Sequence, residues 1–152
     1  MTLTQKETDL LKDMKGQEQL CIQKYEKYAA EACSDELKTL FLALADVERG
    51  HLSTVTDIMN GKVGAVGGSG SSPLANVSTA KVNYSDEQAK KKDAMLCSDM
   101  LTTEKHVSSL YNTGIFEFSD PQARNMLNHI QTEEQQHGLK IYDYMNANGM
   151  YQ

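Results

Sequence analysis

Apolar side chains recur every three or four residues in four stretches of the chain, which is the spacing of one face of a helix. The pattern predicts helices over residues 4–32, over 34–60, from residue 85 onward and over 120–148. The apolar positions, helix by helix, are Leu11, Met14, Cys21, Tyr25, Tyr28 and Ala32; Leu37, Leu40, Phe41, Leu44, Val55 and Ile58; Leu96, Met100, Val107, Tyr111, Ile115 and Phe118; and Met126, Leu127, Ile130, Ile141, Tyr144 and Met145. No alternating β-branched run competes with them, so we expect an all-α protein.

Residues that commonly begin and end helices stand at these boundaries. Thr4 with Glu7, and Ser85 with Gln88, have the spacing of a capping box, in which side chains and backbone amides bond reciprocally. The other boundary signals are an N-cap at Ser34 or Asp35, Asp120 ahead of Pro121, and Gly61 as a stop.

Residues 61–84 have the composition of a linker, including the run Gly67-Gly68-Ser69-Gly70-Ser71-Ser72-Pro73. A connection this long is expected where the second and third helices of a bundle run parallel, because the chain must then return along the whole bundle. We therefore predict a single domain over 1–152. It is a four-helix bundle in which the helix pairs 4–60 and 85–148 are joined by a crossover over 61–84.

Polar residues interrupt all four apolar stripes near mid-helix, and they repeat at one offset. The pairs Glu18 and Glu104, Glu48 and Glu134, and His51 and His137 are each 86 residues apart. Residues at i and i+3 share a helix face, so each Glu-x-x-His pair points two side chains the same way. Four carboxylates and two imidazoles on four helices are the ligand set of a two-metal centre inside a bundle.

Buried carboxylates are costly alone, and four together repel or take up protons. Two divalent cations balance the four negative charges, and carboxylate with imidazole suits Fe best, with Mn or Zn as alternatives. The candidate metal ligands are therefore Glu18, Glu48, His51, Glu104, Glu134 and His137. Glu133, four residues before His137, is an alternative to Glu134, and a metal-free polar cluster or a surface coincidence is the alternative to the centre itself.

Tyr25 and Tyr111 are also 86 residues apart, and each follows its glutamate by two helical turns on the same face. They are candidate catalytic residues that donate hydrogen bonds to ligands or transfer electrons, and the alternative is a pair of core tyrosines. His106 and His129 have no counterpart at this offset, and we expect them to be exposed. Cys21 and Cys97 are expected to serve as small apolar residues.

Composition and charge argue against several classes of partner and of metal site. The net charge of −6 argues against nucleic acid or an anionic membrane as a partner. No apolar run approaches the ~18 residues of a membrane span, and the polar start shows no secretory signal. The three cysteines form no C-x-x-C, which excludes a zinc ribbon or a rubredoxin-type iron site and fits a reducing cytoplasm.

The residues resemble the ferritin-like superfamily. The first half, Gly16-Gln17-Glu18 through Tyr25 to Ala45-Asp46-Val47-Glu48-Arg49-Gly50-His51, is similar to a rubrerythrin di-iron domain. The second half, from Asp93-Ala94-Met95 through Ser119-Asp120-Pro121 to Tyr144-Met145-Asn146-Ala147-Asn148-Gly149-Met150-Tyr151, resembles the Coat F family of spore coat proteins. The resemblance implies a ferritin-like bundle in which Glu18 and Glu104 are terminal ligands while Glu48 and Glu134 bridge two metal ions.

One position departs from the rubrerythrin pattern. Val107 stands where rubrerythrins carry a further glutamate, one turn after the ligand of the third helix, and the chain has no rubredoxin domain. A separate electron donor is therefore implied for any redox chemistry.

The resemblance leaves two functions open. One is a di-iron or di-manganese oxidoreductase acting as a peroxidase, catalase or ferroxidase, located in the cytoplasm or the spore coat. The alternative is a structural spore coat protein without catalytic activity, in which tyrosine-rich segments support assembly. The expected partners are other coat proteins, an electron donor, or a second copy in a homodimer, and neither nucleic acid nor a membrane.

Overall fold

The protein is described here from a computed structural model, in which residues 1–65 and 74–151 are placed. The described residues form four helices and no strand: α1 (Gln5–Glu31), α2 (Asp35–Met59), α3 (Glu87–Glu117) and α4 (Pro121–Ala147). The prediction of an all-α protein is confirmed. The glycine- and serine-rich run 67–73 lies outside the described residues.

Three of the four helix starts are those predicted. Thr4 caps α1 in a capping box with Glu7, Ser34 caps α2, and Asp120 caps α4 ahead of Pro121. The predicted start of α3 is wrong by one residue. The N-cap is Asp86, whose carboxylate accepts from the amide of Gln88 at 2.9 Å, so Ser85 lies outside the helix. A carboxylate at this position also interacts favourably with the positive end of the helix dipole, which a hydroxyl does not.

Glycines in the left-handed conformation end two helices. Gly61, with φ of 77°, follows α2, and Gly149, with φ of 66°, follows α4. In each case the next amide bonds back to a carbonyl of the last turn, Lys62 N to Asp57 O and Met150 N to Met145 O, both at 2.8 Å. The predicted stop at Gly61 is therefore confirmed, because this turn satisfies carbonyls that the helix end leaves open.

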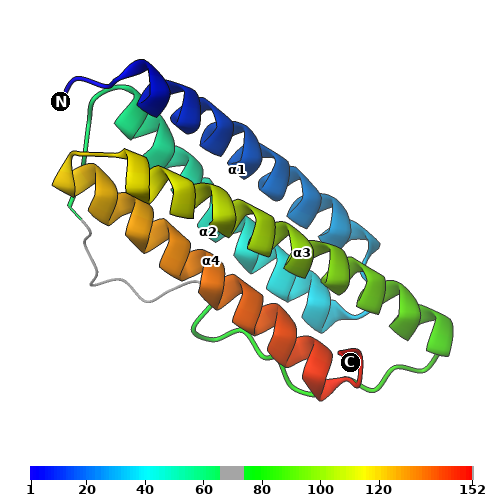
Figure 1. The fold of residues 1–152 in the computed structure, drawn as a ribbon. Coiled ribbons are helices and arrows are strands. Elements are labelled where there is room, and N and C mark those ends of the chain that lie inside the picture. Colours follow the sequence, from blue (N-terminus) through cyan, green and yellow to red (C-terminus); the bar gives the residue numbers. More distant parts are fainter. Residues whose placement is uncertain (66–73, 152) are drawn as a thin grey trace.

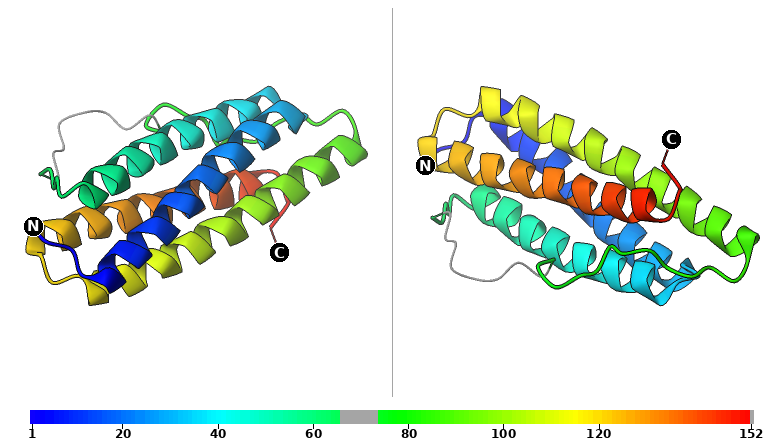
Figure 2. Two further views of the ribbon diagram at one scale, coloured as in Figure 1. Left: turned by 90° about the horizontal axis from the view of Figure 1, so that it is seen from above. Right: turned by 90° about the horizontal axis from the view of Figure 1, so that it is seen from below.

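The helices form a bundle in which each packs mainly against two others: α1 against α2 and α3, and α4 against α3 and α2. These four pairs are antiparallel, whereas α2 and α3, on a diagonal of the bundle, run in the same direction (Figures 1 and 2). The chain must therefore return along the bundle between them. Its described end, residues 74–86, lies against the bundle, and Val82 N donates to Asn148 Oδ1 at 2.8 Å.

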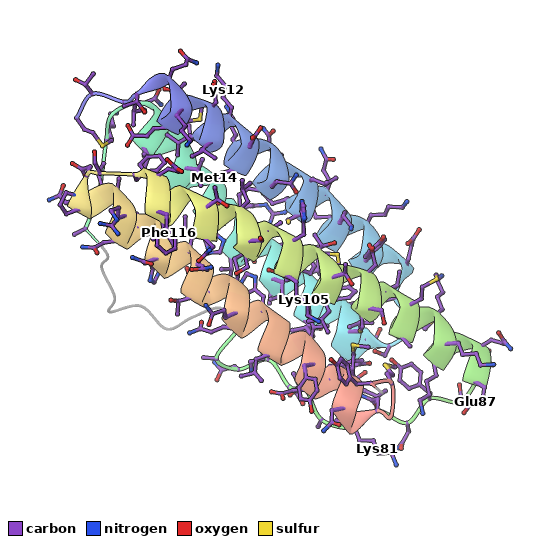
Figure 3. The ribbon with its side chains drawn as sticks, in the orientation of Figure 1. Lys12, Met14, Lys81, Glu87, Lys105 and Phe116 are labelled. Atoms are coloured by element: carbon purple, nitrogen blue, oxygen red, sulfur yellow. The ribbon has the colours of Figure 1, made fainter. Side chains whose placement is uncertain are left out.

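The predicted apolar stripes form the core. All of their residues are buried except Tyr28 and Met126, which are half-buried. The core consists of two apolar clusters, one around Leu40 and Met100 and the other around Leu11 and Leu127. Met14 belongs to the second cluster, while Lys12 and Lys105 project from the surface (Figure 3).

Among the described residues, no helix has the length and apolar character needed to cross a membrane.

Candidate metal centre

The six predicted ligand residues lie together inside the bundle. Glu18 comes from α1, Glu48 and His51 from α2, Glu104 from α3, and Glu134 and His137 from α4. Each side chain is at most 3% exposed to solvent, although glutamate and histidine are normally found at surfaces. The two Glu-x-x-His motifs therefore do not lie on a solvated helix face, which was the alternative of a surface coincidence.

The six residues form two groups of four. One group holds Glu18, Glu48, His51 and Glu134, and the other holds Glu48, Glu104, Glu134 and His137. Within each group, one potential ligand atom from every residue lies within 4.8 Å of the others. Glu48 and Glu134 belong to both groups, so the two positions where a cation would fit are adjacent and share two carboxylates.

Each imidazole directs Nδ1 toward these carboxylates. His51 Nδ1 lies 2.8 Å from Glu134 Oε1 and 3.5 Å from Glu48 Oε2. His137 Nδ1 lies 2.8 Å from Glu48 Oε1 and 3.2 Å from Glu104 Oε1. The two rings are nearly parallel, with their centroids 5.7 Å apart. Each shared glutamate thus lies closest to the histidine of the opposite helix pair.

The hydrogen bonds that are missing distinguish the carboxylates from one another. Both oxygens of Glu48 and of Glu134 are buried without a hydrogen-bond partner among the described residues. Glu18 and Glu104 each leave one such oxygen, Oε2, because Oε1 accepts a tyrosine hydroxyl. Buried polar atoms rarely lack partners, so this many at one place indicate a ligand. Two free oxygens suit a carboxylate that bridges two cations, and one suits a terminal ligand.

The tyrosine bonds cross the bundle. Tyr111 on α3 donates to Glu18 on α1 at 2.7 Å, and Tyr25 on α1 donates to Glu104 on α3. Both rings are fully buried. Burial and the adjacent carboxylates raise the pKa of both hydroxyls well above its usual value, so the phenols stay protonated and remain donors. They hold one oxygen of each terminal carboxylate and leave the other facing the centre.

The carboxyl groups of the centre affect one another's pKa values. Burial raises the pKa of Glu18 well above its usual value, and nearby Glu48 raises it further. Burial also raises the pKa of Glu134 well above its usual value, and Glu104 and Glu48 add to this rise. Burial also disfavours ionised Glu48, but the adjacent Glu18 and the two histidines hold its pKa well below the usual range. Burial lowers the pKa of His51 and His137, yet the surrounding carboxylates outweigh it and bring these values to about 10 and about 9. Positive charge is therefore favoured here.

Glu133 lies outside both groups. Its Oε1 is 3.1 Å from His51 Nε2, the nitrogen that faces away from the centre, and 3.1 Å from His129 Nε2. Glu134, and not Glu133, faces the other carboxylates, so the geometry favours Glu134 as the candidate ligand. His106 is exposed as expected, but His129 is only 41% exposed and bonds to Glu133.

Two surface hollows, on the two sides of α4, have candidate ligands in their walls. A cavity of about 470 Å³ between α3 and α4 has Glu104 and Glu134 in its wall, together with apolar Leu101, Leu139, Tyr142 and Tyr151. A second hollow, of about 350 Å³ between α2 and α4, is lined by His51 and Glu133 among others. A small molecule in the first cavity would lie against two of the candidate ligands.

A second buried polar cluster was not predicted from the sequence. Asp93 on α3 is fully buried and accepts three hydrogen bonds, from the amides of Cys33 and Ser34 at 2.7 and 3.0 Å and from Tyr84 OH at 2.7 Å. Tyr144 OH completes it, at 2.5 Å from Tyr84 OH and 2.6 Å from Ser34 Oγ. The cluster joins the α1–α2 turn, the crossover and the second helix pair. Only the position of Asp93 within an apolar stripe, one turn before Leu96 and Cys97, could have signalled it.

Comparison with known proteins gives one family. The model of the Coat F domain matches residues 92–152, a segment that contains most of α3 and all of α4 and therefore Glu104, Glu134 and His137. No curated protein and no solved structure matches the chain. The Coat F resemblance of the second half is thus confirmed, and the rubrerythrin resemblance of the first half stays a prediction.

Proposed function

We propose that the protein is a ferritin-like di-metal protein of the spore coat, in which a carboxylate-bridged pair of iron ions reduces peroxide or oxygen or handles iron. The observation that carries the proposal is the pair of four-residue groups that share Glu48 and Glu134. The four carboxylate oxygens of these two glutamates have no hydrogen-bond partner among the described residues. The Coat F match supports the coat context. The antiparallel neighbours and the long crossover support the ferritin-like assignment.

Each residue of the centre has a role in this proposal. Glu18 with His51, and Glu104 with His137, would each hold one cation, and Glu48 and Glu134 would bridge the two. Two redox-active cations held by these residues would supply the electrons for reducing peroxide or oxygen. Tyr25 and Tyr111 fix the terminal carboxylates by hydrogen bonds to Glu104 and Glu18. The apolar walls around the centre keep bulk water away from it.

The cavity between α3 and α4 gives a small oxidant a way in. Its wall includes Glu104 and Glu134, so a peroxide or oxygen molecule that enters it would lie next to two of the candidate ligands. Electrons come from a separate donor in this proposal, as the resemblance of the first half to rubrerythrins implies.

The metal content of the purified protein is the first prediction. We expect about two Fe or Mn ions per chain by plasma mass spectrometry of protein purified without a histidine tag, one for each group of four. The double variants Glu48→Ala/His51→Ala and Glu48→Ala/Glu134→Ala should lose both ions and any peroxide or oxygen turnover, because each removes a bridging carboxylate. Glu36→Ala, which removes an exposed glutamate of the same helix, should keep both.

Folded, helical wild-type protein without stoichiometric metal would contradict the proposal. Unchanged turnover in the Glu48→Ala/His51→Ala variant would contradict the catalytic part alone.

A structural role in the coat is the second candidate, and the Coat F match is the observation that favours it. Both candidates predict that antibodies against the chain label the coat of sporulating cells. Labelling confined to the cytoplasm of vegetative cells would exclude the structural role. Labelling of the coat by a protein without metal would leave it as the better of the two.

A further inference from the structure

The outer nitrogens of the two central histidines have different surroundings. His51 Nε2 is 3.1 Å from Glu133 Oε1. His137 Nε2 is buried and has no hydrogen-bond partner among the described residues. Both side chains are at least 97% buried, so bulk water does not supply His137 Nε2 with the hydrogen bond that it lacks.

The difference follows from a break in the internal repeat. At the offset of 86 residues that relates the six candidate ligands, Glu133 corresponds to Val47. Both residues line the hollow between α2 and α4, so the two positions lie on the same side of the bundle. Val47 has no side-chain hydrogen-bond acceptor. His137 therefore lacks a counterpart of the carboxylate that Glu133 provides to His51.

A hydrogen bond at the outer nitrogen changes what the inner nitrogen can do. If Nε2 carries the proton and donates it to Glu133, then Nδ1 of His51 presents its lone pair to the centre in a fixed ring orientation. A carboxylate acceptor also makes the imidazole a stronger donor to a metal ion. His137 in the same tautomer has neither a fixed ring orientation nor increased donor strength, because its Nε2–H has no acceptor in the described part of the chain.

Glu133 is itself held in place. Its Oε1 also lies 3.1 Å from His129 Nε2 one turn earlier on α4, so the carboxylate stands between two imidazoles, one buried and one 41% exposed. It is thus an acceptor with a defined position.

We infer that Glu133 is a positioning residue that makes the two cation positions unequal. The position formed by Glu18 and His51 binds a divalent cation more tightly than the position formed by Glu104 and His137. This inference rests on the proposed function, since it concerns the affinity of the same centre. Its consequence is ordered loading, with the position next to Glu133 filled first and the other retained as the exchangeable one.

The test is a calorimetric titration of the full-length, metal-free chain with Co²⁺ alone, followed in parallel by the visible absorption of the bound ion. For the wild type we expect two steps whose affinities differ by about 10- to 100-fold, the usual effect of such outer carboxylates. Glu133→Ala should weaken the tighter step by about that factor, so that the two steps merge. Glu133→Gln should restore part of the difference, because its amide oxygen still accepts from His51 Nε2.

Two controls separate positioning from general electrostatics and from folding. Asp46→Ala removes a carboxylate from the same hollow, but this carboxylate pairs with Arg49 and has no bond to His51, so both steps should stay unchanged. His129→Ala leaves the Glu133–His51 bond in place and should retain two steps. Metal-free Glu133→Ala should lose some thermal stability, because the buried Nε2 of His51 is left without its acceptor, but its circular dichroism should remain that of the folded helical wild type.

The outcomes distinguish this inference from the function on which it rests. Two equal steps in the wild type, or two unequal steps that Glu133→Ala leaves unchanged, would overturn the inference and leave the di-metal proposal intact. Equal losses in Glu133→Ala and Asp46→Ala would also overturn it, since net charge would then be the cause. No saturable Co²⁺ binding in the wild type would remove the di-metal proposal itself.

Discussion

Glu134→Gln is expected to stabilise the metal-free protein and to abolish its stabilisation by metal. A buried carboxyl without a partner costs about 1–3 kcal/mol, and an amide of the same size carries no charge and can donate to the neighbouring carboxylates. Thermal unfolding should therefore show a midpoint roughly 3–10 °C above that of the metal-free wild type. Saturating Mn²⁺ should raise the wild-type midpoint by about 10–20 °C. Each cation at 100 times its dissociation constant stabilises the folded state by about 2.7 kcal/mol, and two cations bind. The variant should show little of this gain.

The pH dependence of stability checks the same prediction. In the metal-free protein the raised pKa values of Glu18, Glu134, His51 and His137 mean that the folded state binds more protons than the unfolded state. The free energy of unfolding should therefore fall as pH rises from about 5 to 9. Glu48, whose pKa is lowered, is ionised in both states over this range and adds no slope. Glu134→Gln should make the dependence shallower. A variant less stable than the wild type in chelator would show that the carboxyl is satisfied without metal.

Asp93→Ala should destabilise the fold by about 3–5 kcal/mol, measured by urea unfolding. The substitution removes three hydrogen bonds and leaves the amides of Cys33 and Ser34 without acceptors at the start of α2. A typical hydrogen bond contributes a net of about 1 kcal/mol, and the two amides left unpaired add to the loss. A midpoint roughly 10 °C lower is the corresponding thermal effect.

Asp99→Ala on the same helix is the matched control. Asp99 is 43% exposed and pairs with Lys24, so its loss should cost less than about 1 kcal/mol. Both variants should retain full metal content, because neither residue belongs to the two groups of four. If Asp93→Ala cost no more than the control, the cluster would be held by the apolar residues around it and not by Asp93.

The helices and the candidate ligands could be predicted because their signals are periodic. A glutamate within an apolar stripe is exceptional, and the recurrence of Glu18 at Glu104 fixes which of several acidic residues matter. The same register favours Glu134 over Glu133, and Glu134 is the one that lies with the other candidate ligands. The hydrogen bonds between Tyr25 and Glu104 and between Tyr111 and Glu18 extend this pattern, since all four residues obey the offset.

The features that the sequence could not predict depend on tertiary contacts, which follow no periodic pattern along the chain. Asp93 meets Ser34 and Tyr84 only after the bundle has closed, so no local pattern marks the three as partners. His129 was expected to be exposed because it has no counterpart, but its role depends on where Glu133 points. The start of α3 was missed because Ser85 and Asp86 are both good caps, and the choice between neighbours is made by local geometry.

The sharing of Glu48 and Glu134 has a consequence for the ancestry of the chain. Neither half contains a complete group of four, since each group takes one glutamate from the other half. Two identical copies of a single helix pair would supply the same six residues by symmetry, so a centre of this kind could have existed before the halves were joined in one gene. Identical copies, however, must change together. In a single chain each half can change alone, so a difference such as that between Glu133 and Val47 is compatible with a centre that the two halves build jointly.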